Sequence, residues 1–428
     1  MGLKILRISF LFYESVKKRL EQEFYEKKIE SYQKRLQKIF DGFYLYSDSF
    51  SFAMRKVGYE AEEVFYDFKL LQESWAKENG YSPTENWQEE ILLLQIEKIR
   101  PDFLYLQDIN AFSLKTLKSL KKRFSFLKAV IIFRGYPLLN KPLIAKLRVA
   151  DILLVGCPKL IPYCRSYGLS PHLLYHSFDG RILDRLGVKK RSTELSFCGS
   201  SGYGNYFFHL SRYFFLKEVM AKTDLQAWIE ENECVTHSLL LRLLKKCKRQ
   251  VYPLLFSMPD WFLEKLEKGF CVPEKVGYAA ALVKQYQKEE KECFFPTESL
   301  TSLYPDRCFK PLFGLELYKR LYSSKITLNK HALVASPFVD NLRLFDATGV
   351  GSCLVTERGE NLSELFKEDE EVVCYSSKEE CIEKIEYLKR YPEVRESIAK
   401  KGQERTIKNH NPLVRAKKLD VILVSNQS

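Results

Sequence analysis

Long apolar runs, paired cysteines and low-complexity linkers are all missing from this 428-residue sequence. No stretch approaches the ~18 consecutive apolar residues that a membrane-spanning helix requires, so we expect no transmembrane segment. The amino terminus, MGLKILRISF, lacks the small-residue cleavage site of a secretory signal, and Leu6 stands where a myristoylation signal needs Ser or Thr. We therefore expect these residues to form the first strand.

The eleven cysteines are scattered and odd in number. They include no C-x-x-C pair and no Cys/His spacing that suits zinc, so neither a disulfide framework nor a zinc site is expected. Cysteines of this kind are typical of small buried residues in a reducing compartment. The sequence therefore predicts a cytoplasmic protein.

Signatures of nucleic-acid binding are missing too, although the formal net charge of +13 favours an anionic partner. The sequence has no RNP, helix-turn-helix or zinc-finger motif, and its basic residues mostly alternate with acidic ones, as on solvated helices. We therefore expect no nucleic-acid partner. A nucleotide, or peripheral contact with an acidic membrane at the inner face of the cell membrane, suits the charge better.

The sequence does contain a regular alternation of short apolar segments and amphipathic helices, which is typical of parallel α/β sheets. The expected strands are 3–11, 63–66, 102–107, 129–133, 150–156, 172–178, 195–198, 325–328, 352–356 and 372–375. They predict two doubly wound, Rossmann-like domains, at residues 1–183 and 184–405, which face each other across a cleft. Residues 224–300 show no clear strand and are expected to be a helical insertion in the second domain. Residues 406–428 are expected to be a terminal helix.

Polar residues gather in the second half where strands and helices meet. Asn329, Lys330 and His331 follow the buried strand 325–328, and ligands collect at the carboxyl ends of parallel strands. Asn341, Arg343 and Asp346 then precede a glycine pair, Gly349 and Gly351, that allows a helix to end. These residues predict a phosphate and sugar site. Spacing alone favours an ion pair within one helix for Arg343 and Asp346. For His331, a structural role and phosphate binding are equally open.

A glycine-rich stretch, Gly199-Ser200-Ser201-Gly202-Tyr203-Gly204, directly follows the strand 195–198. Backbone N–H groups of such a loop, together with the start of the next helix, can receive an anion. The stretch is neither a Walker A loop nor a G-x-G-x-x-G motif, so a simple connecting turn is the alternative. In the first half, Asp108 and Arg134 follow separate strands, His176 lies near the end of the strand 172–178, and the three are expected to share one rim.

Several motifs resemble the CgeB-like glycosyltransferases, which are relatives of the family 4 group. The strongest is the run from Asn341 to Gly351, NLRLFDATGVG, with LVTE at 354–357 and GQERT at 402–406. Further agreement comes from GLELY at 314–318, SKITLN at 324–329, SFCGS at 196–200 and PDFLYLQD at 101–108. The resemblance covers most of the chain and is weakest between about 205 and 305.

The resemblance implies a GT-B fold and transfer of a sugar, a hexose or a related one, from a UDP- or GDP-sugar to a glycan, a lipid-linked sugar or a protein, without a metal. The donor would contact Gly199, Ser200, Ser201, Gly202, Asn329, Lys330, His331, Asn341, Arg343, Asp346 and Gly349. Arg343 would stabilise the leaving diphosphate, and Asp346 would accept the ribose hydroxyls.

One position departs from the family pattern. Family 4 enzymes usually carry a second glutamate eight residues before the position of Asp346, and this chain has Phe338 there. A retaining reaction is the family expectation, whereas an inverting reaction would need a base such as Asp108 or His176. Phe338 also leaves open a non-catalytic GT-B scaffold that binds a nucleotide or a glycan.

Overall fold

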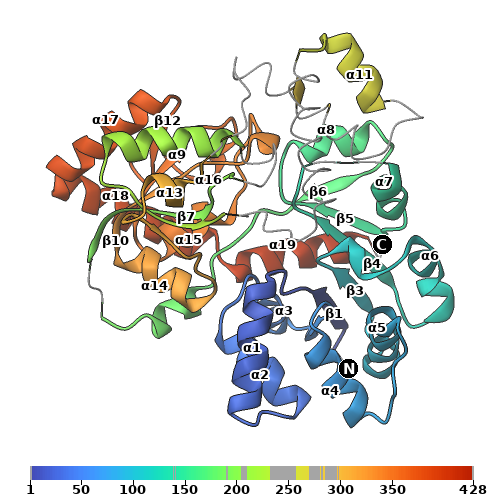
Figure 1. Cartoon of the computed structure of the whole chain (residues 1–428). Coiled ribbons are helices and arrows are strands. Elements are labelled where there is room, and N and C mark those ends of the chain that lie inside the picture. Colours follow the sequence, from blue (N-terminus) through green and yellow to red (C-terminus); the bar gives the residue numbers. More distant parts are fainter. Residues whose placement is uncertain are drawn as a thin grey trace, which may run out of the picture.

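The computed structural model describes residues 2–137, 139, 141–188, 191–203, 210–231, 257–268 and 298–426, together with positions 280, 283, 284 and 296. Its strands form two six-stranded sheets in which all pairs are parallel. Figure 1 shows the two sheets side by side, each flanked by helices. The predicted α/β class with two sheets is confirmed.

The first sheet has the strand order β2-β1-β3-β4-β5-β6 and the second has the order β12-β11-β10-β7-β8-β9. The strands of the first sheet are β1 (Lys4–Ser9), β2 (Glu60–Phe65), β3 (Phe103–Leu106), β4 (Ala129–Arg134), β5 (Ile152–Val155) and β6 (Pro171–Leu173). Those of the second are β7 (Thr193–Ser200), β8 (Gln226–Glu230), β9 (Cys308–Phe309), β10 (Ser324–Asn329), β11 (Cys353–Glu357) and β12 (Val373–Tyr375).

Helices lie between the strands in chain order. Those before β7 are α1 (Glu14–Glu26), α2 (Tyr32–Asp41), α3 (Ser49–Val57), α4 (Lys69–Glu78), α5 (Trp87–Ile99), α6 (Leu114–Arg123), α7 (Lys141–Leu147) and α8 (Leu160–Arg165), with 3-10 turns η1 (Ile109–Ala111) and η2 (Gly180–Arg185). The later ones are α9 (Leu210–Lys222), α11 (Asp260–Lys268), α13 (Leu300–Leu303), α14 (Leu315–Ser323), η3 (Leu333–Ala335), α15 (Leu342–Gly349), α16 (Leu362–Leu365), α17 (Lys378–Arg390), α18 (Pro392–Asn409) and α19 (Pro412–Ser425).

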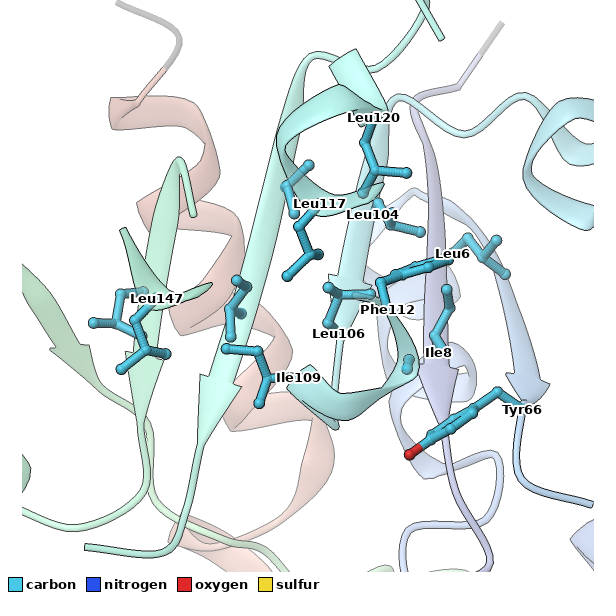
Figure 2. Close-up of a cluster of buried hydrophobic side chains, with 14 of the residues drawn as sticks. Leu6, Ile8, Tyr66, Leu104, Leu106, Ile109, Phe112, Leu117, Leu120 and Leu147 are labelled. Carbon is cyan, nitrogen blue, oxygen red and sulfur yellow. The ribbon is translucent and has the colours of Figure 1, made fainter. Parts of the chain in front are cut away.

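Both faces of the first sheet are buried. Successive side chains of a strand point to opposite sides, so each strand contributes to two separate apolar clusters. Leu6 and Ile8 of β1 pack on one face against side chains of β3, η1 and α6, as Figure 2 shows. Ile5, on the other face, packs in a separate cluster with residues of α3 and α19. The apolar strand composition that predicted this sheet is thus accounted for by burial on two sides.

Helix α19 returns from the second sheet to the first. Ala416 and Leu419 belong to the cluster that covers β1, β3 and β4, and the Tyr59 hydroxyl donates to Asp420 Oδ1 at 2.7 Å. Figure 1 shows α19, in red, running to the carboxyl terminus beside β4. The expected terminal segment from residue 406 is therefore the end of α18 followed by α19.

The expectation of a helical insertion at 224–300 is wrong at its start, because residues 226–230 form β8. Trp228 and Ile229 are almost fully buried, and β8 pairs with β7 on one side and β9 on the other. The burial explains why a polar-looking segment forms a strand. Most of the remaining interval, including 232–256, 269–279 and 285–295, lies outside the described residues.

Two further observations bear on the composition. All seven cysteines in the described part of the chain are buried and free of disulfides. The helices that the model describes include none that combines the length and the apolar character needed to cross a bilayer.

Candidate functional site

A cavity of about 120 Å³ lies where the two sheets face each other, at the carboxyl ends of β7 and β8. In the second sheet the strand order reverses between β7 and β10, and ligands bind beside such switch points. We call it the donor cavity. Its wall from the second sheet includes Gly199, Ser200, Trp228, Glu230, Tyr318, Arg343 and Asp346.

Arg343 and Asp346 occupy the first two turns of α15, so both side chains point to the same side of the helix. The Arg343 guanidinium donates from Nη1 to Asp346 Oδ2 at 3.1 Å and from Nε to the Cys198 carbonyl at 3.3 Å. Both the intrahelical ion pair and the common cavity wall that the sequence suggested are present. Burial raises the pKa of Asp346 to about 6, although Arg343 and the Tyr318 hydroxyl act in the opposite direction.

Glu230 adds a second carboxylate to the donor cavity. It is the last residue of β8, and burial raises the pKa of its carboxyl group. Glu230 is not among the predicted site residues, because the sequence pattern predicts a helical insertion over residues 224–300. The signal that could have found it is the apolar trio Ala227, Trp228 and Ile229, which directly precedes Glu230 and Glu231.

The first sheet contributes Tyr13, Phe43, Tyr44 and Leu45 to the same cavity. The Tyr13 ring packs against Phe313 at a centroid distance of 4.2 Å. Burial raises the pKa of the Tyr13 hydroxyl, and the negative charge of Glu230 raises it further. Tyr13 opens α1, which follows β1. The cavity is thus closed by residues from both halves of the chain, a relationship that no local sequence pattern can reveal.

Backbone contacts hold these walls together. The Leu315 N–H donates to the Gly42 carbonyl at 2.9 Å, and a Cβ at Gly314 would lie 2.3 Å from that carbonyl oxygen. Gly314 also has a positive φ of 57°, which favours glycine. Nearby, Arg19 donates to Glu316 at 2.9 Å and to the Tyr44 hydroxyl at 2.6 Å.

Asn329, His331 and Asn341 form a buried polar network next to the donor cavity rather than part of its wall. Asn329 and Asn341 exchange side-chain hydrogen bonds of 2.8 and 3.2 Å, and Asn341 Oδ1 also caps α15 by accepting from Leu344 N. The His331 ring contacts Thr356 Oγ1 at 3.1 Å, and burial lowers the pKa of His331 to about 3. These contacts account for the polar residues at this strand end by fixing β10 to α15.

Lys330 lies close by, but its ammonium group forms an ion pair with Glu357. The Arg212 guanidinium donates to the Lys330 carbonyl at 2.8 Å. Gly349 faces away from the cavity, since a Cβ there would lie 2.3 Å from the Phe178 ring. The contribution of Lys330 and Gly349 to donor binding stays a prediction.

The glycine-rich stretch begins later than expected, because Gly199 and Ser200 still pair with Ile229 and Glu230 as strand residues. Gly199 and Ser200 line the donor cavity, whereas Ser201 is fully buried and its Oγ accepts from Tyr203 N at 3.1 Å. Gly202 has a φ of 89° and turns the chain. Gly204 lies outside the described residues.

The two candidate bases of the first sheet lie apart. Asp108 accepts from the Tyr66 hydroxyl at 2.6 Å and from Asn110 N at 2.9 Å, so it caps η1. His176 lines a second cavity, between the first sheet, α3 and α19. Burial lowers the pKa of His176 to about 4. The structure therefore does not bring Asp108 or His176 to the donor cavity, and their role as a base stays a prediction.

Phe338, at the position of the missing family glutamate, is half-buried and packs against the cluster that fills one face of the first sheet. Lys159 donates to the carbonyls of Val334 and Ser336 at 2.9 and 2.7 Å in the same segment. The segment thus binds the two halves together. Among the described residues, no three His, Cys, Asp or Glu side chains meet in a way that could hold a metal ion.

Comparison with known proteins finds one family that matches part of the sequence and several solved structures with a similar fold. Residues 274–420 match the family described as Glycosyl transferase-like. No curated protein matches the sequence. Similar solved structures include Anabaena HepE in complex with UDP and with UDP-glucose, each with a TM-score of 0.53, 9% identity, and coverage of 99% of this chain and 100% of that chain.

Two further structures span nearly the full length. Sucrose-phosphate synthase from Thermosynechococcus elongatus has a TM-score of 0.53 and 11% identity, with coverage of 99% of this chain and 98% of that chain. A glycosyltransferase from Rickettsia africae has a TM-score of 0.50 and 9% identity, with coverage of 100% and 99%. At such identities these likenesses show the fold. Residues 274–420 are thus similar to a glycosyl transferase-like family, and the chain has the two-sheet fold found in GT-B glycosyltransferase structures.

Proposed function

We propose that this protein is a glycosyltransferase that binds a nucleotide-sugar, with the nucleotide at the donor cavity. The observation that carries the proposal is the Arg343 and Asp346 pair, which faces a cavity at the carboxyl ends of β7 and β8 together with the backbone of Gly199 and Ser200. A guanidinium and loop N–H groups suit a diphosphate. A buried carboxylate suits the paired hydroxyls of a ribose.

The nucleotide is proposed to be UDP, with GDP as the alternative. Support comes from HepE, which has the same fold and was solved with UDP and UDP-glucose. The donor cavity is smaller than the about 150 Å³ that holds a benzene ring, so it accommodates only part of a nucleotide as it stands.

Charge stabilisation of the leaving diphosphate is assigned to Arg343, because Arg343 lines the donor cavity, whereas Lys330 does not line it and is paired with Glu357. In this proposal the reaction proceeds without a resident metal ion. Retention of configuration and a CgeB-like assignment remain the finer parts of the proposal, and they rest on the motifs from Asn341 to Gly351. The acceptor is a glycan, a lipid-linked sugar or a protein.

A second candidate, a non-catalytic scaffold, is favoured by one observation. Phe338 is half-buried against the cluster on one face of the first sheet, at the position where family 4 enzymes usually carry a second glutamate. A scaffold would bind the nucleotide without turning over the sugar.

Incubation with a panel of UDP- and GDP-sugars, with release of nucleoside diphosphate as the readout, separates the two candidates. The enzyme is expected to release diphosphate slowly from one donor by hydrolysis, and Arg343→Gln is expected to abolish the release. Nucleotide binding without any release would support the scaffold. Absence of both binding and release would overturn the proposed function.

A peripheral membrane partner is the last part of the proposal, and the net charge of +13 supports it. Co-sedimentation with vesicles that contain acidic lipid, compared with neutral vesicles, tests it. Equal recovery with both kinds of vesicle would contradict it.

A further inference from the structure

The second cavity, which we call the first-sheet cavity, lies at the switch point of the first sheet. The strand order reverses between β1 and β3, and the cavity wall takes Arg7 from β1, Tyr105 from β3 and Gln107 just after β3. Helices α3 and α19 close it from the other side through Phe50 and Leu419. By the same rule that applies to the donor cavity, this position is where an α/β sheet binds a ligand.

Two buried side chains in this wall have polar groups without partners. Tyr105 is 3% exposed and Gln107 is 8% exposed, yet neither the Tyr105 hydroxyl nor the Gln107 side-chain amide bonds to any described residue. Both groups face the space of the cavity, where a ligand can replace water with hydrogen bonds of its own. These two groups line a common space, and that arrangement points to a ligand that completes their hydrogen bonds.

The charges around the cavity favour an anion. Arg7 is paired with Glu63 at 2.6 Å, and its Nη2 donates to the Ser47 carbonyl at 2.8 Å, so this cation is locally balanced. Arg415 of α19 instead donates to neutral acceptors, namely the carbonyls of Tyr175 and His176 at 2.9 Å and His410 Nδ1 at 3.0 Å. No described carboxylate forms an ion pair with Arg415, and none lines the cavity. The wall therefore carries one uncompensated positive charge.

The cavity volume limits the size of the group that enters. It is about 70 Å³, roughly half of the about 150 Å³ that holds a benzene ring. A carboxylate or a phosphate group fits this space, whereas a whole sugar ring does not. Phe50 and Tyr46 provide flat apolar surface beside it, which suits the remainder of a sugar-bearing molecule.

A strained loop connects the first-sheet cavity to the donor cavity. Phe43, Leu45 and Ser47 have positive φ values of 50°, 47° and 42°, a conformation that non-glycine residues rarely adopt. Phe43 and Leu45 line the donor cavity, and Tyr46 lines the first-sheet cavity. Strain of this kind persists where surrounding structure enforces it, often next to a ligand site. The two cavities thus share one wall.

We propose that the first-sheet cavity binds a carboxylate or phosphate substituent of the sugar acceptor, held by Tyr105, Gln107 and Arg415. The acceptor is then an acidic sugar unit, either a uronic acid or a sugar phosphate. This inference rests on the proposed function for its link to transfer, while the binding of the acid group stands on the cavity alone.

Isothermal titration of the full-length protein at pH 7.5 tests the inference with three probes: D-glucuronate, D-glucose 6-phosphate and uncharged D-glucose. We expect saturable binding of at least one charged probe, at least about tenfold tighter than D-glucose, and the better probe identifies the acid group. Gln107→Glu keeps the size of the side chain and adds a negative charge, so it is expected to weaken that binding by about tenfold or more. Tyr105→Phe is expected to weaken it by about fivefold.

Tyr59→Phe is the matched control, since Tyr59 packs in the same cluster but its hydroxyl is bonded to Asp420 outside the cavity. It is expected to lower the melting temperature and leave probe affinity unchanged, the reverse of Tyr105→Phe. No binding of either charged probe, equal binding of D-glucose, or unchanged affinity in both Gln107→Glu and Tyr105→Phe would overturn the inference.

A parallel titration with UDP distinguishes failure of the acid site from failure of the proposed function. Normal UDP binding without probe binding removes the acid site and leaves the proposed function intact. Probe binding in a protein that binds no nucleotide would overturn the assignment of the site to an acceptor.

Discussion

Asp346 accepts a hydrogen bond of 3.1 Å from Arg343, one turn earlier in α15, inside a cavity that both sheets enclose. Burial acts on this carboxyl group more strongly than its partners do, so its pKa is raised to about 6 from an ordinary value of 3.8. The pair therefore holds a carboxylate that is costly to keep charged. A ligand that donates hydrogen bonds to it would offset that cost.

Replacement of Asp346 by Asn is predicted to weaken UDP binding by about tenfold or more, because hydrogen bonds to a charged group are lost. The same change should lower the melting temperature at pH 7.5 only slightly, because it removes the partner of Arg343 but also removes a carboxylate whose charged form burial disfavours. The raised pKa of Asp346 favours the folded state below about pH 4, and this contribution is lost as the pH rises through about 6. Calorimetry and thermal unfolding measure the two effects. Full UDP affinity in Asp346→Asn would contradict the site.

The affinity for UDP-glucose is predicted to rise between pH 5 and pH 7 and then level off, as Asp346 loses its proton around pH 6. UDP-glucose is a better probe than UDP, because its diphosphate diester does not titrate in this range, whereas the terminal phosphate of UDP does. Asp346→Asn should give a flat profile. Glu230→Gln is the control, and a profile that flattens in this variant alone would assign the pH dependence to Glu230 instead.

Gly314→Ala is predicted to destabilise the contact between the two halves of the chain, because the new Cβ would lie 2.3 Å from the Gly42 carbonyl oxygen. Gly168→Ala is a matched control, with a similar positive φ of 73° and no atom within 4 Å of the added Cβ. The control should lower the free energy of unfolding by about 1 kcal/mol, because of its φ alone. Gly314→Ala should lower it by about 1–3 kcal/mol more. Equal losses in chemical denaturation would show that the close approach is unimportant.

The ion pair between Arg7 and Glu63 is predicted to be important for stability, because both side chains are almost fully buried. Glu63→Gln leaves a buried cation without its partner and should cost about 3 kcal/mol or more. Lys4 and Glu60 pair across the same two strands, but their side chains are 40% and 53% exposed. Glu60→Gln should therefore cost less than about 1 kcal/mol. Similar unfolding free energies for the two variants would contradict this reading of the pair.

Much of the fold could be predicted from the sequence, because buried parallel strands such as β4 and β10 are short, apolar and bounded by polar residues. Strand β8 was missed because only its three central residues are apolar and the segments around it are rich in charge. Burial by neighbouring strands decided its conformation. That information lies in the tertiary structure.

The candidate site divides in the same way. Arg343 and Asp346 could be found because they belong to one helix and one motif. Tyr13 and Glu230 could not, since they reach the donor cavity from opposite halves of the chain. Asn329 and Asn341 were identified as polar residues at the right place, but their mutual hydrogen bonds depend on how β10 meets α15.

A crystal structure of the protein grown with UDP tests the central claim most directly. We predict that the diphosphate lies within hydrogen-bond distance of the Arg343 guanidinium and the Gly199 to Ser200 backbone, with the ribose hydroxyls on Asp346. UDP bound elsewhere on the molecule, with Arg343 and Asp346 still bonded only to protein groups, would contradict the account.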